Sequence, residues 1–335
     1  MTLKLKDIKQ KLKVAKKGQI ELPFHLVFAL IAGSVILLIF IIFAFKGYNV
    51  SKAEASIDIS NTLNLLLTST EVSPKTFLPI EDLPKSKLEF TCEDFSIGGQ
   101  AKSYQNKIVF APSQLETTKL FIWSFDWNAP FYVTNMIAIT SPSVIYVFVG
   151  ANNDPLQNSI QSAFPKNITA RFVENVATFP YTGHEYARFV FVNPSSNIAL
   201  PQSFANKKVS ALKIVGTLES GTIDFYKNDF KKPLLTIPAE YYGSALLFGA
   251  IFTDNAETYT CNIGKAINRL KNIAKIYEKK QEILRGNIPG GRICTYNAPI
   301  KELITITGQD FLITTIENIR KTNKVLQQQS CPVIY

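Results

Sequence analysis

Four cysteines are the residues whose chemistry this 335-residue sequence predicts most directly, and they are widely spaced: Cys92, Cys261, Cys294 and Cys331. Zinc sites usually draw on closer pairs such as Cys-x-x-Cys, and the two histidines, His25 and His184, lie far along the chain from every cysteine. An even number of dispersed cysteines is typical of an exported domain, where no thiol pool keeps them reduced. We therefore predict two disulfides and no metal; free buried thiols and a metal site are the alternatives.

Other groups that could carry catalysis are sparse. The sequence has no Gly-x-Ser-x-Gly elbow, phosphate loop, dinucleotide fingerprint or His-Glu-x-x-His motif. His184 is interpreted as part of a surface loop that enters a strand rather than as a catalytic base. The acid pairs Glu81-Asp82 and Glu93-Asp94 could bind a cation or act as acid and base, but adjacent side chains diverge, which favours solvated turns. We predict no cofactor, and a carboxylate-dependent hydrolase stays as an alternative.

Four aromatic residues alternate along one predicted strand, which places them on one face of it: Phe121, Trp123, Phe125 and Trp127. An open face of this kind could stack sugars or another apolar partner. A covered face would be the thickest part of the core. The core is the favoured interpretation, and a glycan-binding face is the alternative.

Two runs at helical spacing close the chain, one from Cys261 to about Leu284 and one from Leu303 to about Leu326, with glycines and a proline between them. They predict a helical hairpin. A helix of about 24 residues separates its ends by about 36 Å, whereas disulfide partners need Cα atoms within about 7 Å. Cys294 is therefore expected to be out of reach of Cys261. Cys331 follows the second, antiparallel helix and is expected to return towards Cys261. Of the three possible pairings we therefore favour Cys261–Cys331 with Cys92–Cys294.

Short β-branched and aromatic runs separated by turn residues predict strands between residues 88 and 226, among them Val144 to Val149. Asp154 and Pro155 then give the cap and first residue of a helix that reaches about Phe164. Strands and helices alternate in part. The predicted fold is an α/β or α+β ectodomain with a mixed sheet and a C-terminal helical hairpin, on an N-terminal transmembrane helix.

The transmembrane prediction rests on the apolar run of residues 23–46, which is long enough to cross a bilayer as a helix. Seven lysines precede this run, so the positive-inside rule places the N-terminus in the cytoplasm and residues 48–335 outside a cell membrane crossed once. The formal net charge is +10, of which these lysines and one aspartate give about +6. No dense basic stripe is left elsewhere, which disfavours nucleic acid as a partner.

The predicted organisation has five parts. Residues 1–18 are a basic cytoplasmic tail or signal, 19–47 the transmembrane helix, 48–86 a stalk and Pro-containing linker, 87–260 the strand-rich α/β ectodomain, and 261–335 a helical hairpin packed on it. Two glycosylation sequons begin at Asn49 and Asn167.

The junction Lys16-Lys17-Gly18-Gln19-Ile20-Glu21-Leu22 resembles the archaeal class III signal peptide of type IV pilin-like proteins. The resemblance implies cleavage after Gly18, which makes Gln19 the new N-terminus, and gives Glu21 the role of docking a subunit into a filament. The family's glutamate usually stands fifth after the cut, whereas Glu21 stands third and Pro23 fifth. This departure puts filament assembly in doubt, and an uncleaved signal anchor is the alternative.

Three further motifs are similar to archaeal single-pass membrane proteins of this layout, a group that supplies no catalytic residue: residues 108–112, 127–131 and 330–335. The predicted function is a membrane-anchored cell-surface structural or interaction protein that can be a pilin-like subunit. The alternatives are a tethered extracellular enzyme and an accessory subunit of a secretion or transport complex. Expected partners are membrane lipid, further copies of the chain or other surface proteins, and glycans.

Overall fold

The computed structural model describes residues 24–335 apart from 177–178, 181–182, 196–197, 200, 202–203, 205–207, 227–231, 287–293 and 307–312. The chain divides into two compact units, Met1–Ala55 and Ser56–Tyr335. Helix α2, Phe24–Val72, begins in the first unit and ends in the second. All the described strands lie in the second unit.

The predicted fold class needs correction. Among the described residues no helix is both long enough and apolar enough to cross a membrane. The predicted span at residues 19–47 starts with residues that lie outside the described ones, and the apolar run that follows is part of a 49-residue helix whose later turns mix polar and apolar residues. The strands also form several separate sheets instead of one mixed sheet.

Two four-stranded sheets come first in the chain. One is antiparallel in the order β4-β3-β2-β6, with β2 at Ser86–Phe90, β3 at Asp94–Ile97, β4 at Gln100–Ser103 and β6 at Gln114–Thr117. The other has the order β1-β7-β8-β5, with β1 at Phe77–Ile80, β5 at Val109–Phe110, β7 at Leu120–Asn128 and β8 at Tyr132–Thr140. In this second sheet β5 runs parallel to β8 and the other pairs are antiparallel.

The third sheet has six strands in the order β10-β9-β11-β12-β13-β14. Its strands are β9 at Val144–Val149, β10 at Ala170–Val173, β11 at Tyr186–Val192, β12 at Lys208–Gly216, β13 at Ser220–Tyr226 and β14 at Ala239–Tyr242. The first four strands in this order are parallel and the last two pairs are antiparallel.

Helix α3, Pro155–Ala163, crosses from β9 to β10 and confirms the predicted start signal. The Asp154 carboxylate accepts a hydrogen bond of 2.9 Å from the backbone N–H of Gln157. This bond satisfies one of the free donors of the first turn, and Pro155 needs none.

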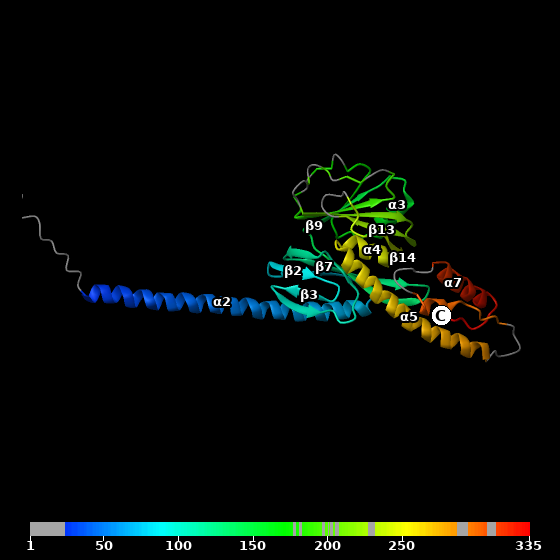
Figure 1. Cartoon of the computed structure of the whole chain (residues 1–335), viewed down its shortest axis with the longest axis horizontal. Helices are drawn as coiled ribbons and strands as arrows, with labels where there is room; N and C mark the ends of the chain where they lie inside the picture. The colour runs from blue at the N-terminus through cyan, green and yellow to red at the C-terminus, as the bar shows by residue number, and fades with distance from the viewer. Residues whose placement is uncertain are drawn as a thin grey trace, which may run out of the picture. The chain divides into compact units, whose positions relative to one another are not determined.

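Helix α4, Ser244–Phe252, packs between the second and third sheets (Figure 1). Its residues from Ala245 on are buried. Phe248 contacts Trp123 of β7, with ring centroids 5.0 Å apart, and Phe252 contacts Tyr146 of β9 at 5.2 Å. Gly249 permits the close approach to β5, because a Cβ there would lie 2.7 Å from the Phe110 ring. An apolar helix that is covered on all sides is the expected result of this position.

The C-terminal part differs from the predicted hairpin. Helix α5 spans Ala256–Gly286, α6 spans Ile300–Ile304 and α7 spans Ile313–Gln328. Arg285 and Gln281 of α5 donate hydrogen bonds to the carbonyls of Tyr296 and Ala298, so the chain from 294 to 299 runs back along α5 in the opposite direction. The return path is thus an extended segment and α6, and α7 brings the chain again towards the C-terminal end of α5 (Figure 1).

A polar cluster joins the end of α2 to the rest of the second unit. The Arg269 guanidinium of α5 forms an ion pair with Glu71 at 3.0 Å and also donates to Thr134 and to the carbonyl of Asn106. The Asn135 side chain donates to the Glu71 carbonyl at 2.7 Å. One arginine therefore links α2, α5, β8 and the loop before β5.

We expect Arg269→Met to lower the free energy of unfolding by about 1–3 kcal/mol. The substitution leaves the Glu71 carboxylate without its cation, and it removes the hydrogen-bond donor to the Thr134 hydroxyl and the Asn106 carbonyl. Lys275→Met, at an exposed position of the same helix, is the matched control and should change stability by less than about 0.5 kcal/mol. Urea denaturation of both variants measures the difference. Equal stabilities would show that the cluster does not fix α2.

Buried tyrosines give the fold an alkaline limit. Burial raises the pKa values of Tyr104, Tyr146, Tyr241 and Tyr259 above the ordinary value. In the unfolded chain these phenols ionise near pH 10. Their contribution to stability is therefore complete below about pH 10 and is lost as the pH rises towards the raised folded pKa values.

We expect these phenols to ionise together with unfolding, above about pH 10. Arg188 acts in the opposite direction, because burial lowers its pKa to about 10 and its neutral form favours the folded state above that pH. Four tyrosines outweigh one arginine. Tyrosinate absorbance and circular dichroism, followed on the same alkaline titration, should change at one midpoint; ionisation of these phenols near pH 10 with the fold intact would contradict the assignment.

Candidate functional site

A cleft lies at the amino-terminal ends of β11 and β12, next to the end of α4, and part of it is lined by a buried charged residue, Arg188. We call it the Arg188 cleft. It consists of two cavities of about 200 and 710 Å³ that share five lining residues: Ser113, Lys208, Val209, Ser210 and Asp254. The smaller cavity is walled mostly by apolar and aromatic side chains, including Tyr146, Tyr186 and Phe252.

Arg188 is the unusual residue of this cleft, because it is 3% exposed and carries a charge. Its Nε and Nη2 atoms donate to the carbonyls of Ile251 and Ala250 at 3.3 and 3.0 Å, and Nη2 also donates to the carbonyl of Thr253. These carbonyls form the end of α4, where the helix dipole favours a cation. The buried Nη1 atom has no acceptor among the described residues. Burial lowers the pKa of Arg188 to about 10, so the guanidinium stays charged at neutral pH.

The rim of the Arg188 cleft is polar, and two of its charged groups, Asp254 and Lys208, already have partners. The Asp254 carboxylate accepts hydrogen bonds from the backbone N–H and the hydroxyl of Ser113, at 2.7 and 3.0 Å. The Lys208 ammonium contacts Glu185 at 2.9 Å and the Tyr186 hydroxyl at 3.1 Å, and the bond to Glu185 raises the pKa of Lys208. No histidine or cysteine is among the residues that line the cleft. The arrangement suits binding better than proton transfer or nucleophilic attack.

The predicted aromatic face is part of the core. Trp127 is 1% exposed and its indole N–H donates to the carbonyl of Tyr242 at 2.7 Å. Phe125 is buried, while Phe121 and Trp123 are partly buried and pack against the same core. Helix α4 covers this face, since Phe248 contacts Trp123. Phe121 contacts Phe77 of β1, the strand that pairs with β7 in the same sheet.

The structure contains two disulfides, as predicted, but the predicted pairing is wrong. The bonds are Cys92–Cys261 and Cys294–Cys331, with Cα separations of 6.1 and 6.0 Å. The reason is the return path after α5. Because the extended segment, and not α7, runs back along α5, the end of α7 lies near Cys294. The Tyr296 hydroxyl donates to the Pro332 carbonyl there at 2.9 Å. Cys261 is left to join the turn between β2 and β3.

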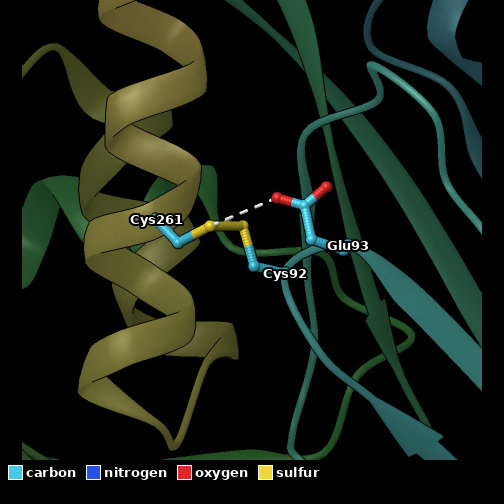
Figure 2. Close-up of side chains that lie close together, drawn as sticks. All are labelled: Cys92, Glu93 and Cys261. Atoms are coloured by element: carbon cyan, nitrogen blue, oxygen red, sulfur yellow. Dashed lines mark hydrogen bonds between the residues drawn. A yellow bond between two sulfur atoms is a disulfide. The ribbon is translucent and has the colours of Figure 1, made fainter.

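The Cys92–Cys261 disulfide lies next to one residue of the predicted acid pairs, as Figure 2 shows. Glu93 Oε1 lies 3.7 Å from Cys261 Sγ, and Glu93 Oε2 forms an ion pair with Lys265 at 3.2 Å. Asp94 points elsewhere and accepts a hydrogen bond from the Thr91 hydroxyl. Glu81, of the other pair, forms an exposed ion pair with Lys119. Glu93 and Asp94 thus have different partners.

The remaining predicted sites receive little structural context. Gly18, Gln19 and Glu21 lie outside the described residues. Asn49 lies in α2, Asn167 is exposed after α3, and His184 is partly buried just before β11. The structure therefore places the Asn167 sequon at an accessible surface position and does not bring the other residues into one site.

No family model, curated protein or solved structure matches this chain. The Arg188 cleft is therefore defined by its geometry alone. Sequence reasoning missed it, although one signal was available: Arg188 is a single charge within the apolar strand Ala187 to Val192. A buried charge of that kind needs partners from other elements, and its position could have marked it as a candidate.

Proposed function

We propose that this chain is an exported surface protein that acts by binding, and that the Arg188 cleft is its binding site. The observation that carries the proposal is the cleft itself, a mostly apolar hollow next to a buried guanidinium with an unused donor. Sites of this composition bind a small apolar group that carries a hydrogen-bond acceptor. Export is supported by the two disulfides, which persist in oxidising compartments outside the cytoplasm.

Ser210→Trp tests the binding site. Ser210 lines both cavities, so an indole at this position fills the space without touching the disulfides. Val215→Trp is the matched control, because Val215 belongs to the same strand and is 44% exposed. In a ligand-observed NMR screen of small carboxylates and carbonyl compounds on the full chain, we expect hits that Ser210→Trp loses and Val215→Trp keeps. Hits that survive Ser210→Trp would contradict the proposal.

The export proposal has its own test. Intact cells that express the chain are treated with a membrane-impermeant amine reagent and a thiol reagent before lysis. We expect lysines of residues 56–335 to be labelled and all four cysteines to resist thiol labelling until a reductant is added. Protected lysines together with free thiols would place the chain in a reducing compartment.

A pilin-like subunit is a second candidate, favoured by the first unit of the chain. Apolar side chains of α2 are exposed there, with Leu37 at 62% and Phe40 at 69%. An exposed apolar helical surface of this kind marks an interaction site, and in a filament copies of the same helix pack against it. Mass spectrometry of the native N-terminus and electron microscopy of the same cells test this proposal. A terminus at Gln19 with filaments supports it, whereas an intact Met1 without filaments counts against it.

A further inference from the structure

Side-chain oxygens that could bind a metal ion lie next to the Cys92–Cys261 disulfide. Ligand atoms of Cys92, Glu93 and Cys261 lie within 4.8 Å of one another, the single group of this kind among the described residues (Figure 2). A fourth atom, Oδ1 of Asn262, lies 3.8 Å from Cys92 Sγ. While the disulfide is intact the sulfurs are bonded to each other and cannot act as thiolate ligands.

We propose that the reduced chain holds a divalent cation of the Zn²⁺ and Cd²⁺ class between Cys92, Cys261, Glu93 and Asn262. The same two cysteines would thus join the turn between β2 and β3 to α5 in either state, through sulfur in the oxidised chain and through a metal in the reduced one. The reduced chain exists before the disulfide forms, so the site is independent of the proposed function.

The geometry of the four donors fits this cation class. Tetrahedral zinc bonds to sulfur are about 2.3 Å long, which places two sulfur ligands about 3.8 Å apart. Breaking the disulfide lets the sulfurs separate to that distance across Cα atoms that are 6.1 Å apart. Two thiolates with two oxygen donors form a mixed set that borderline and soft cations accept.

Neighbouring groups hold the oxygen donors in place. The Asn262 amide nitrogen donates to the Val109 carbonyl at 2.7 Å, which turns Oδ1 towards the sulfurs. Lys265 binds Glu93 through Oε2 and the Cys92 carbonyl at 2.6 Å, so Oε1 is the carboxylate oxygen that faces Cys261. Contacts of this kind orient ligands in metal sites, and the ammonium of Lys265 also favours thiolates.

The reactions balance without an unnamed reagent. A trialkylphosphine reduces the disulfide: the sulfur–sulfur bond breaks, each sulfur takes a proton, and phosphorus is oxidised to the phosphine oxide with oxygen from water. The cation then forms two metal–sulfur bonds and releases the two thiol protons. The metal itself is neither oxidised nor reduced.

The second disulfide gives a matched control within the same chain. The variant Cys294→Ser with Cys331→Ser keeps Cys92 and Cys261 as its only thiol pair. The variant Cys92→Ser with Cys261→Ser keeps Cys294 and Cys331 instead, and among the described residues no His, Asp or Glu side chain lies close enough to join that pair as a third ligand. Both full-length variants are reduced with the phosphine and titrated with Cd²⁺, and the thiolate-to-cadmium absorbance is followed. We expect one equivalent to bind the first variant at least about tenfold more tightly than the second.

Glu93→Gln in the first variant tests the carboxylate ligand. It should weaken Cd²⁺ binding by about tenfold or more, since a neutral amide replaces a charged oxygen ligand. Glu89→Gln, an exposed carboxylate of β2 outside the group, should leave the affinity unchanged. Equal affinities of the two thiol pairs, which is also the result expected from an unfolded reduced chain, would overturn the proposal, as would binding that Glu93→Gln does not alter.

Discussion

Replacing Cys92 and Cys261 together with serine is expected to lower the free energy of unfolding of the oxidised protein by about 3–5 kcal/mol. The two residues are 169 positions apart, so their bond removes a large amount of conformational freedom from the unfolded chain. In the folded state it also ties the turn between β2 and β3 to α5. Denaturation in urea without reductant, at equal protein concentrations, measures the loss.

The control for this prediction is the double replacement of Cys294 and Cys331. These residues are 37 positions apart, and the shorter loop makes the expected loss about 1 kcal/mol smaller than for the first pair. A larger loss from the Cys294 and Cys331 variant would contradict the entropic argument. It would mean that local packing of the C-terminal segment against α5 governs the effect.

Disulfide pairing illustrates what helical spacing alone cannot predict. The sequence indicates that α5 is long and that a second helix follows. It gives no sign that residues 294–299 run back along α5 as an extended segment held by side chains such as Gln281 and Arg285. A few side-chain hydrogen bonds decide the direction of the return, and the pairing of two disulfides depends on it.

The elements with local signals were predictable, and those defined by burial were not. Strand β9 and helix α3 follow from a β-branched run and from the Asp154-Pro155 start signal. Helix α4 has no polar face, because two sheets cover it, and an uninterrupted apolar run shows no helical period. Strand β8 is likewise buried along nearly its whole length, so buried and exposed residues do not alternate along it. When other elements cover a helix or strand on every side, its sequence loses the polar–apolar periodicity on which a sequence-based assignment depends.

The Arg188 cleft shows the same limit at the level of a site. Arg188 comes from β11, its carbonyl partners from the end of α4, and Asp254 and Ser113 from loops about 140 residues apart. No motif of fixed spacing joins these segments. Glu93 and Cys92 are adjacent and were both singled out as candidates, yet their relation to Cys261 and Asn262 of α5 required the fold.

Trp127→Ala is expected to lower the free energy of unfolding by about 3–5 kcal/mol, as large-to-small replacements of buried aromatic residues do. Trp127 is 1% exposed, so the substitution leaves a cavity between β7 and β14. It also leaves the Tyr242 carbonyl without the indole N–H that it accepts at 2.7 Å. Chemical denaturation with circular dichroism measures the loss.

Trp123→Ala is the matched control on the same strand, four residues away and on the same face. Trp123 is partly buried and packs edge-on against Phe248 and Phe252, so its removal should cost less, about 1–3 kcal/mol. The order of the two losses distinguishes a core from an exposed platform. If both variants keep the stability of the original protein and lose binding to glycans, the alternating aromatic residues form a binding face after all, and the position of α4 over β7 is wrong.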